Sequence, residues 1–256
     1  EYFSFICKEM FNIDLLPTQA LMLREMWNRK FPMLIASRGF GKSFILSVYA
    51  ILRALLMPGR KVIIVGAAFR QSKILFEYMD SIWRNSPILR DIVGGTGGPR
   101  RDVDMCRLTI GESTVTCLPL GDGTKIRGQR ANDIIADEFA SIPREIFENV
   151  VAGFAAVTAS PVENVRRIAS QKKAIELGEV KDDEQVAYEG AGNQIILSGT
   201  AYYDFNHFAE YWKKWRQIIQ SKGHPKKLAE IFGEEEVPKA FDWKQYSIIR
   251  VPFELL

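Results

Sequence analysis

The segment "ASRGFGKSF", from Ala36 to Phe44, directly follows the apolar run "FPMLI". It matches the phosphate-binding pattern G-x-x-x-x-G-K-[ST], except that Ala36 replaces the first glycine. In this pattern, backbone N–H groups at a helix start surround a phosphate, the lysine (Lys42) reaches the β- and γ-phosphates, and the hydroxyl (Ser43) binds magnesium. Alanine is tolerated where the backbone keeps φ negative. The segment therefore predicts a nucleotide phosphate site.

Two acidic residues offer the second half of such a site. The apolar run in "NDIIADEF" ends in Asp137 and Glu138. A carboxylate there can hold magnesium directly or through water, and a neighbouring glutamate can polarise a water molecule. Kinases that act on metabolites need no such glutamate, so Glu138 favours hydrolysis. The bland alternative is a buried strand that ends in a polar turn.

Three cations, Lys125, Arg127 and Arg130, precede these carboxylates within "KIRGQRAND". Nucleotide hydrolysis commonly uses a cation near the γ-phosphate to stabilise charge in the transition state. Loop arginines are also commonly just exposed to water. A catalytic role for at least one of the three and simple solvation both stay open.

The elements that must position these residues follow from hydrophobic periodicity. From residue 31 onward, short apolar runs alternate with longer amphipathic stretches, which is typical of βαβ units and a parallel sheet. Ligands collect at the carboxyl ends of strands in such sheets, so the chemistry is expected there. Glycine- and arginine-rich loops are expected at 92–102 and 120–133. The expected elements are strands within 32–36, 61–67, 132–139 and 193–201, helices at 42–57 and about 70–85, and a hairpin within 102–119.

Composition bounds the remaining possibilities. The chain has 256 residues, 47% of them apolar and 25% charged, which suits one sizeable core plus a small subdomain. The net charge of +3 does not by itself indicate a nucleic-acid partner. Three cysteines and two histidines support neither a disulfide framework nor a zinc site. The sequence holds no membrane-length apolar run and no signal pattern, and it begins with Glu1, as a fragment would.

Several motifs occur together in order: "LLPTQ", "SRGFGKS", "KIRGQRANDIIADE" and "ILSGTA". As a set, they resemble the ATPase domain of the large terminase subunit of tailed double-stranded DNA bacteriophages. The resemblance spans roughly Asp14 to Tyr202. It implies an α/β fold, a P-loop NTPase core of the ASCE/RecA-like type with a mostly parallel sheet flanked by helices. Residues 1–222 would form this core, and residues 223–256 a small lid or linker subdomain.

The resemblance also implies a function and roles for individual residues. The protein would be an ATPase that couples Mg2+-ATP hydrolysis to translocation of double-stranded DNA into a procapsid. Glu138 would activate water, and Arg38 would act as a γ-phosphate sensor or cis-acting cation. Arg127, or alternatively Arg130, would reach into a neighbouring subunit. The implied ligand-binding residues are Gln19 for adenine; Ser37, Arg38, Gly39, Phe40, Gly41, Lys42 and Ser43 for the phosphates; Ser43 and Asp137 for Mg2+; and Ser198, Gly199 and Thr200 as the coupling motif, for which a plain polar turn remains the alternative.

The implied partners are double-stranded DNA, further copies in a homo-oligomeric ring on a portal protein, and the small terminase subunit. The expected location is the host cell cytoplasm, with no membrane contact. Members of the family also carry a C-terminal nuclease domain with clustered acidic residues. The sequence ends at "VPFELL", and beyond the acidic run at 234–236 it has no further acidic cluster. We therefore expect an ATPase fragment without nuclease activity.

Two other functions compete with this one. A superfamily 2 helicase-like translocase shares these motifs, but two tandem α/β cores would be expected there. A non-hydrolysing module, in which ATP only orders an assembly surface, would have no use for Glu138. DNA contacts are the least specified feature: Arg100, Arg101 and the lysines within 211–227 are candidates. Trp212, Trp215 and Ile219 could equally form the core face of an amphipathic helix.

Overall fold

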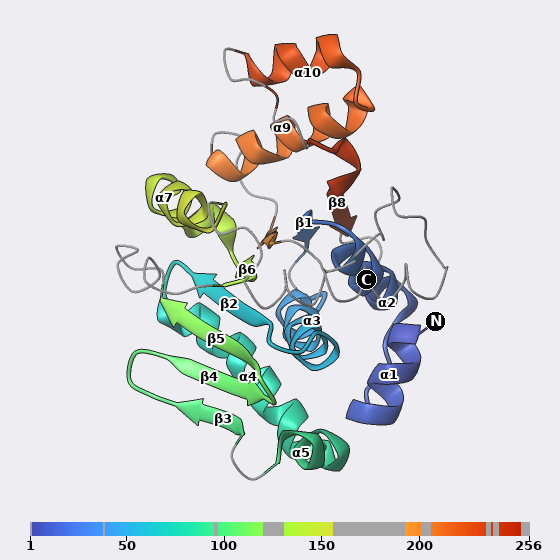
Figure 1. Cartoon of the computed structure of the whole chain (residues 1–256), viewed down its shortest axis with the longest axis vertical. Helices are drawn as coiled ribbons and strands as arrows, with labels where there is room; N and C mark the ends of the chain where they lie inside the picture. The colour runs from blue at the N-terminus through green and yellow to red at the C-terminus, as the bar shows by residue number, and fades with distance from the viewer. Residues whose placement is uncertain are drawn as a thin grey trace, which may run out of the picture.

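The computed structural model describes residues 2–37, 39–94, 97–119, 131–155, 193–200, 206–233, 237 and 241–251. Within these residues the chain forms a central sheet with helices on both faces (Figure 1). The helices are α1 (Tyr2–Phe11), α2 (Pro17–Asn28), α3 (Lys42–Leu56), α4 (Phe69–Asn85), α5 (Pro87–Val93), α7 (Arg144–Ala155), α9 (His207–Ser221) and α10 (Pro225–Phe232), with 3-10 turns η1 (Phe139–Ser141) and η2 (Trp243–Gln245). The strands are β1 (Phe31–Ala36), β2 (Lys61–Gly66), β3 (Gly98–Arg101), β4 (Cys106–Ile110), β5 (Ser113–Pro119), β6 (Asp133–Ala136), β7 (Gln194–Gly199) and β8 (Tyr246–Val251).

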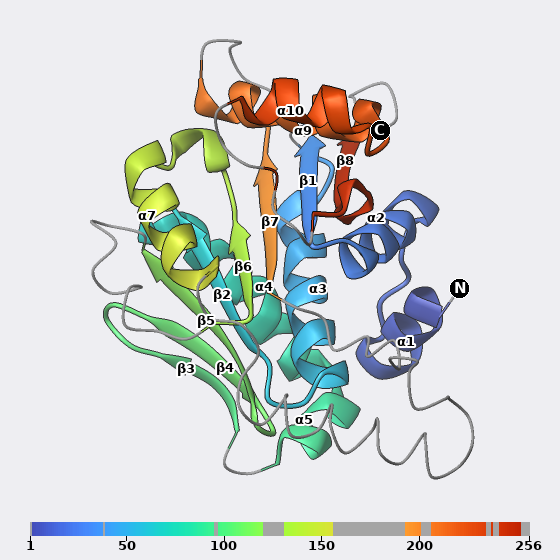
Figure 2. The ribbon, with the colours of Figure 1, turned by 45° about the horizontal axis from the view of Figure 1, so that its top comes forward.

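The strand order is β3-β4-β5-β2-β6-β7-β1-β8. Every neighbouring pair from β5 to β8 is parallel, whereas β3, β4 and β5 pair antiparallel. Figure 2 shows β6, β7, β1 and β8 side by side. The predicted α/β class with a mostly parallel sheet is confirmed. The predicted hairpin within 102–119 is also present, as β4 and β5 turning at Gly111 with φ +55°.

Two strands were not expected from the sequence. Residues 98–101, placed in a loop, form β3, because backbone pairing with β4 from Gly98↔Thr109 to Arg101↔Cys106 outweighs the weak strand propensity of glycine and proline. Residues 246–251, placed in the lid or linker subdomain, form β8 beside β1. The boundary at residue 223 stays a prediction, but β8 is part of the central sheet.

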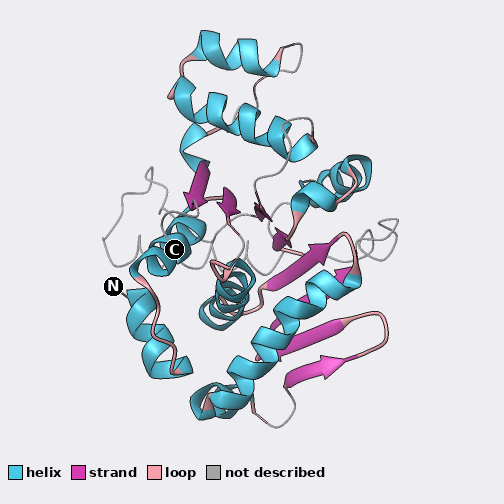
Figure 3. Ribbon diagram, turned by 180° about the vertical axis from the view of Figure 1, so that it is seen from behind, coloured by secondary structure: helices cyan, strands magenta, loops and turns pink. Residues whose placement is uncertain are grey.

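The sheet separates two hydrophobic cores, as the period-2 alternation of its strands requires. In β1, Leu34 faces the core that contains side chains of α1 to α5, and Met33 faces the core that contains those of α7 and α9. Figure 3, seen from behind, shows α4 lying across the sheet on the side of the first of these cores. No helix in the described ranges is long and apolar enough to cross a membrane.

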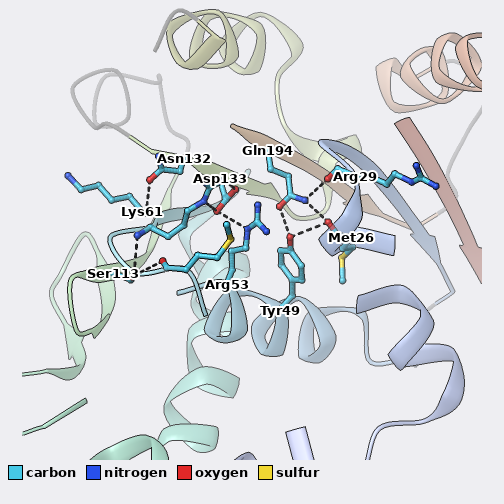
Figure 4. A network of polar contacts seen from close by, with 11 residues as sticks. Met26, Arg29, Tyr49, Arg53, Lys61, Ser113, Asn132, Asp133 and Gln194 are labelled. Carbon is cyan, nitrogen blue, oxygen red and sulfur yellow. Dashed lines mark hydrogen bonds and ion pairs between the residues drawn. The ribbon is translucent and has the colours of Figure 1, made fainter. Parts of the chain in front are cut away.

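Polar side chains are buried between α3 and the amino ends of the parallel strands (Figure 4). Asp133, the first residue of β6, is fully buried and accepts hydrogen bonds from Arg60 Nε at 2.7 Å and Arg60 Nη2 at 2.8 Å. Arg53 of α3 adds a third contact, with its Nε 3.3 Å from Asp133 Oδ2. Burying these charges is tolerable only because they are paired.

A second buried contact lies beside this cluster. Tyr49, one turn before Arg53 on α3, donates from its hydroxyl to Gln194 Oε1 at 2.6 Å. Gln194 is the first residue of β7, and its Nε2 donates to the carbonyl oxygens of Met26 and Arg29. Helix α3 is therefore fixed by specific polar contacts to the first residues of two neighbouring strands, β6 and β7.

We expect Asp133→Ala to lower the free energy of unfolding by about 3–5 kcal/mol, because it leaves two buried guanidinium groups without their carboxylate. Urea unfolding without nucleotide measures the change. Asp14→Ala is the matched control, since Asp14 forms an exposed ion pair with Lys8 and its loss should cost less than about 1 kcal/mol. Equal stability of the two variants would contradict the structural role of the buried cluster.

Candidate active site

The predicted phosphate loop lies between β1 and α3. Ala36 is the last residue of β1, so its extended backbone explains why glycine is not needed there. Gly39 and Gly41 have φ of 91° and 80°, a region that strongly favours glycine. The Ser37 backbone N–H donates to the carbonyl of Val251 at the end of β8, at 3.2 Å. The loop thus has the strand–turn–helix context that the motif requires.

The two carboxylates at the end of β6 face the start of α3. Lys42 Nζ donates to Glu138 Oε1 at 2.7 Å and lies 3.7 Å from Asp137 Oδ1. Ser43 Oγ lies 3.5 Å from Asp137 Oδ2, at the limit of a hydrogen bond. The structure therefore brings together the lysine, hydroxyl and carboxylates that the sequence predicted as one site.

Glu138 has an unusual backbone conformation. Its φ of 50° and ψ of 47° lie in the left-handed region, which non-glycine residues seldom adopt and which costs of order 1 kcal/mol. Its side chain is about one-third exposed, and its carboxylate meets Lys42. Strained backbones gather at functional sites, so this conformation marks Glu138 as a candidate for chemistry.

Asp137 is buried to 3% exposure of its side chain. Burial raises the pKa of its carboxyl; Lys42 opposes this shift, and the nearby Glu138 carboxylate adds to it. Ser198 Oγ donates to Asp137 Oδ1 at 3.1 Å. The ionised Asp137 is therefore incompletely compensated by the protein, which suits a residue that meets an additional cation.

The remaining predicted residues lie around this centre. Ser198 is fully buried at the carboxyl end of β7, and Thr200 is half-buried just beyond it. Gly199 packs against Phe208, whose Cε1 would lie 2.8 Å from an added Cβ. Phe40 is buried within the loop.

Gln19 lies in the first turn of α2, where its Oε1 accepts from the Leu16 backbone N–H at 3.0 Å. Its Nε2 faces the phosphate loop, 3.8 Å from where a Cβ on Gly41 would be. This placement puts Gln19 against the loop, while its role in reading adenine stays a prediction.

The donor set fits magnesium, which prefers hard oxygen ligands and usually takes only one or two from the protein. The Ser43 hydroxyl and the Asp137 carboxylate are such oxygens, and they already converge. Asp137 is also the buried carboxylate whose charge is undercompensated.

Other predicted residues lie outside the described part of the chain: Arg38, Lys125, Arg127, Arg130 and the acidic run at 234–236. Sequence reasoning missed the β8 carbonyl of Val251 beside the phosphate loop, although the run "YSIIRV" contains an available strand signal. It also missed the buried pairing of Asp133 with Arg53 and Arg60, because no local pattern links these residues.

This combination of a mostly parallel sheet, a glycine loop that opens a helix, and two facing carboxylates is that of a P-loop NTPase fold. Residues 33–158 match the family model described as terminase large subunit, T4likevirus-type, N-terminal. The matched part carries the phosphate loop and both carboxylates. The predicted resemblance to large terminases is thus confirmed for this part of the chain.

Solved structures agree on the fold. The large terminase of a thermophilic bacteriophage is similar with a TM-score of 0.54 and 11% identity, over 91% of this chain and 45% of that one. The complex of that terminase with ADP gives a TM-score of 0.53 and 11% identity, over 92% and 44%. The HK97 bacteriophage large terminase gives 0.55 and 13% identity, over 90% and 41%. The chain thus spans less than half the length of these terminases. Comparison with curated proteins gave no match.

We expect Asp137→Asn to stabilise the protein at pH 8 without nucleotide or divalent cations, by about 0.5–2 kcal/mol. The pKa of Asp137 is raised in the folded state, so the wild type is relatively stabilised at low pH and loses that stabilisation as pH rises through this pKa. The advantage of the asparagine variant should therefore shrink as pH falls towards 4. Urea unfolding at several pH values measures it.

Asp133→Asn is the control for this experiment, because that carboxylate is paired with two arginines and should lose stability at pH 8. If Asp137→Asn is the less stable protein at every pH, its attraction to Lys42 outweighs its burial.

Proposed function

We propose that this chain is the ATP-hydrolysing motor part of a phage DNA-packaging terminase, which couples hydrolysis of Mg2+-ATP to translocation of double-stranded DNA. The observation that carries this proposal is that Lys42 and Ser43 contact Asp137 and Glu138 at the carboxyl ends of the parallel strands. The ADP complex of the thermophilic phage terminase, a protein of the same fold, supports a nucleotide as ligand.

The chemistry assigned to these residues is in-line attack of water on the γ-phosphorus. Glu138 accepts a proton from that water as the new P–O bond forms, while the bond between the γ-phosphorus and the β–γ bridging oxygen breaks. Lys42 offsets negative charge on the β- and γ-phosphates. Magnesium, held by Ser43 and Asp137, would supply charge neutralisation of the phosphate oxygens.

The contact between Lys42 and Glu138 gives this scheme an order of events. Both groups are needed elsewhere during hydrolysis, the lysine at the phosphates and the glutamate at the water. In the structure they bind each other at 2.7 Å. Phosphates that take up Lys42 would therefore also release the Glu138 carboxylate, so that the base becomes available once nucleotide is bound.

Further parts of the proposal rest on the family resemblance. Arg38 would stabilise the γ-phosphate from within the same chain, and Arg127 or Arg130 would do so from a neighbouring subunit. Subunits would form a homo-oligomeric ring on a portal protein, together with the small terminase subunit, in the host cell cytoplasm.

A non-hydrolysing nucleotide module is the second candidate function. It would use Lys42 and Gln19 in the same way, but it gives no reason for the strained backbone of Glu138. A superfamily 2 helicase-like translocase is disfavoured by the family match at residues 33–158.

We expect Glu138→Gln to retain ATP binding and to lower the hydrolysis rate by about 10²–10⁴-fold, because the amide cannot accept the proton. Phosphate release over a range of protein concentrations, together with binding of a fluorescent nucleotide, measures both properties. Glu148→Gln is the control, since Glu148 is a partly exposed glutamate paired with Arg144. Wild type that binds ATP without turnover at any concentration, and equals Glu138→Gln, would support the non-hydrolysing module instead.

The same assay tests the arginines. With a residue supplied by a neighbouring subunit, turnover per subunit should rise with protein concentration, and Arg127→Ala should lose turnover while it still binds ATP. Arg130→Ala distinguishes the two candidates. Turnover that does not depend on concentration, with neither variant impaired, would contradict an arginine acting between subunits.

A further inference from the structure

A groove of about 720 Å3 lies between α9 and β8, on the side where the end of α2 meets the edge of the sheet. Arg216 of α9, Lys244 of η2 and Arg250 of β8 are exposed cations on its walls. The half-buried Arg29 adds a fourth. No aspartate or glutamate lines it among the described residues. The groove therefore attracts anions.

A second cavity, between α7 and α9, has a different character. It has a volume of about 420 Å3, and its polar lining mixes Arg144 and Lys214 with Glu148 and Glu210. Arg144 pairs with both glutamates, at 2.8 Å and 2.7 Å. In the groove, by contrast, an ion pair is formed only by Arg29, with Glu25 at 3.4 Å, as far as the described residues go. Three of its four cations are thus available to an anionic partner.

Aromatic rings also line the groove, but these rings already contact other residues of the protein. The guanidinium of Arg216 lies 5.2 Å from the centroid of the Trp212 ring. Tyr246 stacks on Phe31 at 4.7 Å, and Trp243 packs against Gly223, where an added Cβ would be 2.8 Å from its Cδ1. The rings thus hold the walls in place, which leaves the cations rather than the ring faces to meet a ligand. This favours phosphate groups over stacked, unpaired bases.

The amphipathic interpretation of α9 is only partly correct. Trp215 and Ile218 are buried in the core, and the half-buried Trp212 packs against it. Ile219 is half-buried and, like Trp212, lines the groove. Of the other DNA candidates, Arg101 forms an ion pair with Asp80 at 2.5 Å. The groove is therefore a better candidate for phosphate contacts than the segment around Arg101.

The groove is also connected to the phosphate loop. Strand β8 pairs with β1 at every position from Phe31↔Tyr246 to Ala36↔Val251, and Arg250 is the partner of Ile35. One residue further on, the Val251 carbonyl accepts from the Ser37 backbone N–H. A ligand bound to Arg250 would thus contact β8, which is paired with β1, and β1 continues into the phosphate loop.

We propose that this groove binds the phosphate backbone of double-stranded DNA, and that it is a contact through which the motor engages its substrate. The proposal rests on the proposed function for the identity of the anion, but it can fail separately. Three observations support the proposal: the positive charge of the groove, the aromatic rings that already contact other residues of the protein, and the pairing of β8 with β1.

The test is a double variant, Arg216→Gln with Arg250→Gln, compared with Lys61→Gln with Lys73→Gln. Lys61 and Lys73 are exposed on β2 and α4 and do not line the groove. Binding of a fluorescent 30-bp duplex is followed by anisotropy between 50 and 200 mM salt. The groove variant should bind at least tenfold more weakly at 50 mM, and its log–log salt slope should fall by about 1.8, which corresponds to two lost phosphate contacts. The control variant should bind like the wild type.

A charge-conserving double variant and two control measurements distinguish lost phosphate contacts from misfolding. Arg216→Lys with Arg250→Lys keeps the charge and should restore most of the binding. Thermal unfolding and nucleotide binding should be unchanged in all variants. Equal loss in the groove and control variants, or no duplex binding by the wild type at 50 mM, would overturn the proposal. Competition provides a further test, with competitor concentrations counted in negative charges. If single-stranded DNA or polyglutamate displaces the labelled duplex at a lower concentration than unlabelled duplex does, the proposal is also overturned.

The outcomes also separate the groove from the motor. If the wild type hydrolyses ATP and the groove variant binds duplex normally, the groove assignment is wrong and the motor stands. If the groove variant loses duplex binding while neither the wild type nor any variant hydrolyses ATP, the DNA site stands and the motor proposal fails.

Discussion

Helix α3 is held by polar contacts to the first residues of β6 and β7 and, at its other end, to Asp137, which directly follows β6. The geometry of the candidate site depends on these contacts. At the amino ends of the strands, Arg53 meets Asp133 of β6 and Tyr49 meets Gln194 of β7. At the carboxyl ends, Lys42 and Ser43 meet Asp137. Asp137 also accepts a hydrogen bond from the Ser198 hydroxyl of β7. The helical rise from Lys42 to Arg53 is roughly 16 Å, and the strand rise from Asp133 to Asp137 is roughly 13 Å. The two spans differ by about one strand residue, so side chains of one helix can reach both ends of β6.

The two ends differ in how well their charges are compensated. Asp133 has two guanidinium partners, and this end stabilises the fold. At the other end, Asp137 is buried with one distant ammonium, and Glu138 adopts a left-handed backbone. Such a site tends to reduce stability in exchange for readiness to bind a ligand. The well-paired end explains how the fold tolerates it.

The parts that sequence analysis predicted are those written in consecutive residues. The glycine loop with Lys42, the buried run before Asp137 and the apolar strand before Ser198 each show their role locally, and their convergence followed from the general behaviour of parallel sheets. β3 was missed because Gly98 and Pro99 carry little strand propensity, and the strand exists through its partner β4. β8 was missed because a segment beyond a long polar stretch gave no sign that it would return to pair with β1. The Arg60–Asp133 pair spans 73 residues, and no periodicity reveals such a contact.

The alignment of β8 with β1 has a mechanical consequence. The two strands run parallel through six paired residues, so a pull along β8 loads their hydrogen bonds in shear. Bonds loaded in shear share the force, whereas bonds at the end of a peeled hairpin break one at a time. Tension on the outer strand would therefore arrive at the nucleotide loop as a small displacement of the whole strand pair, with little slack between them.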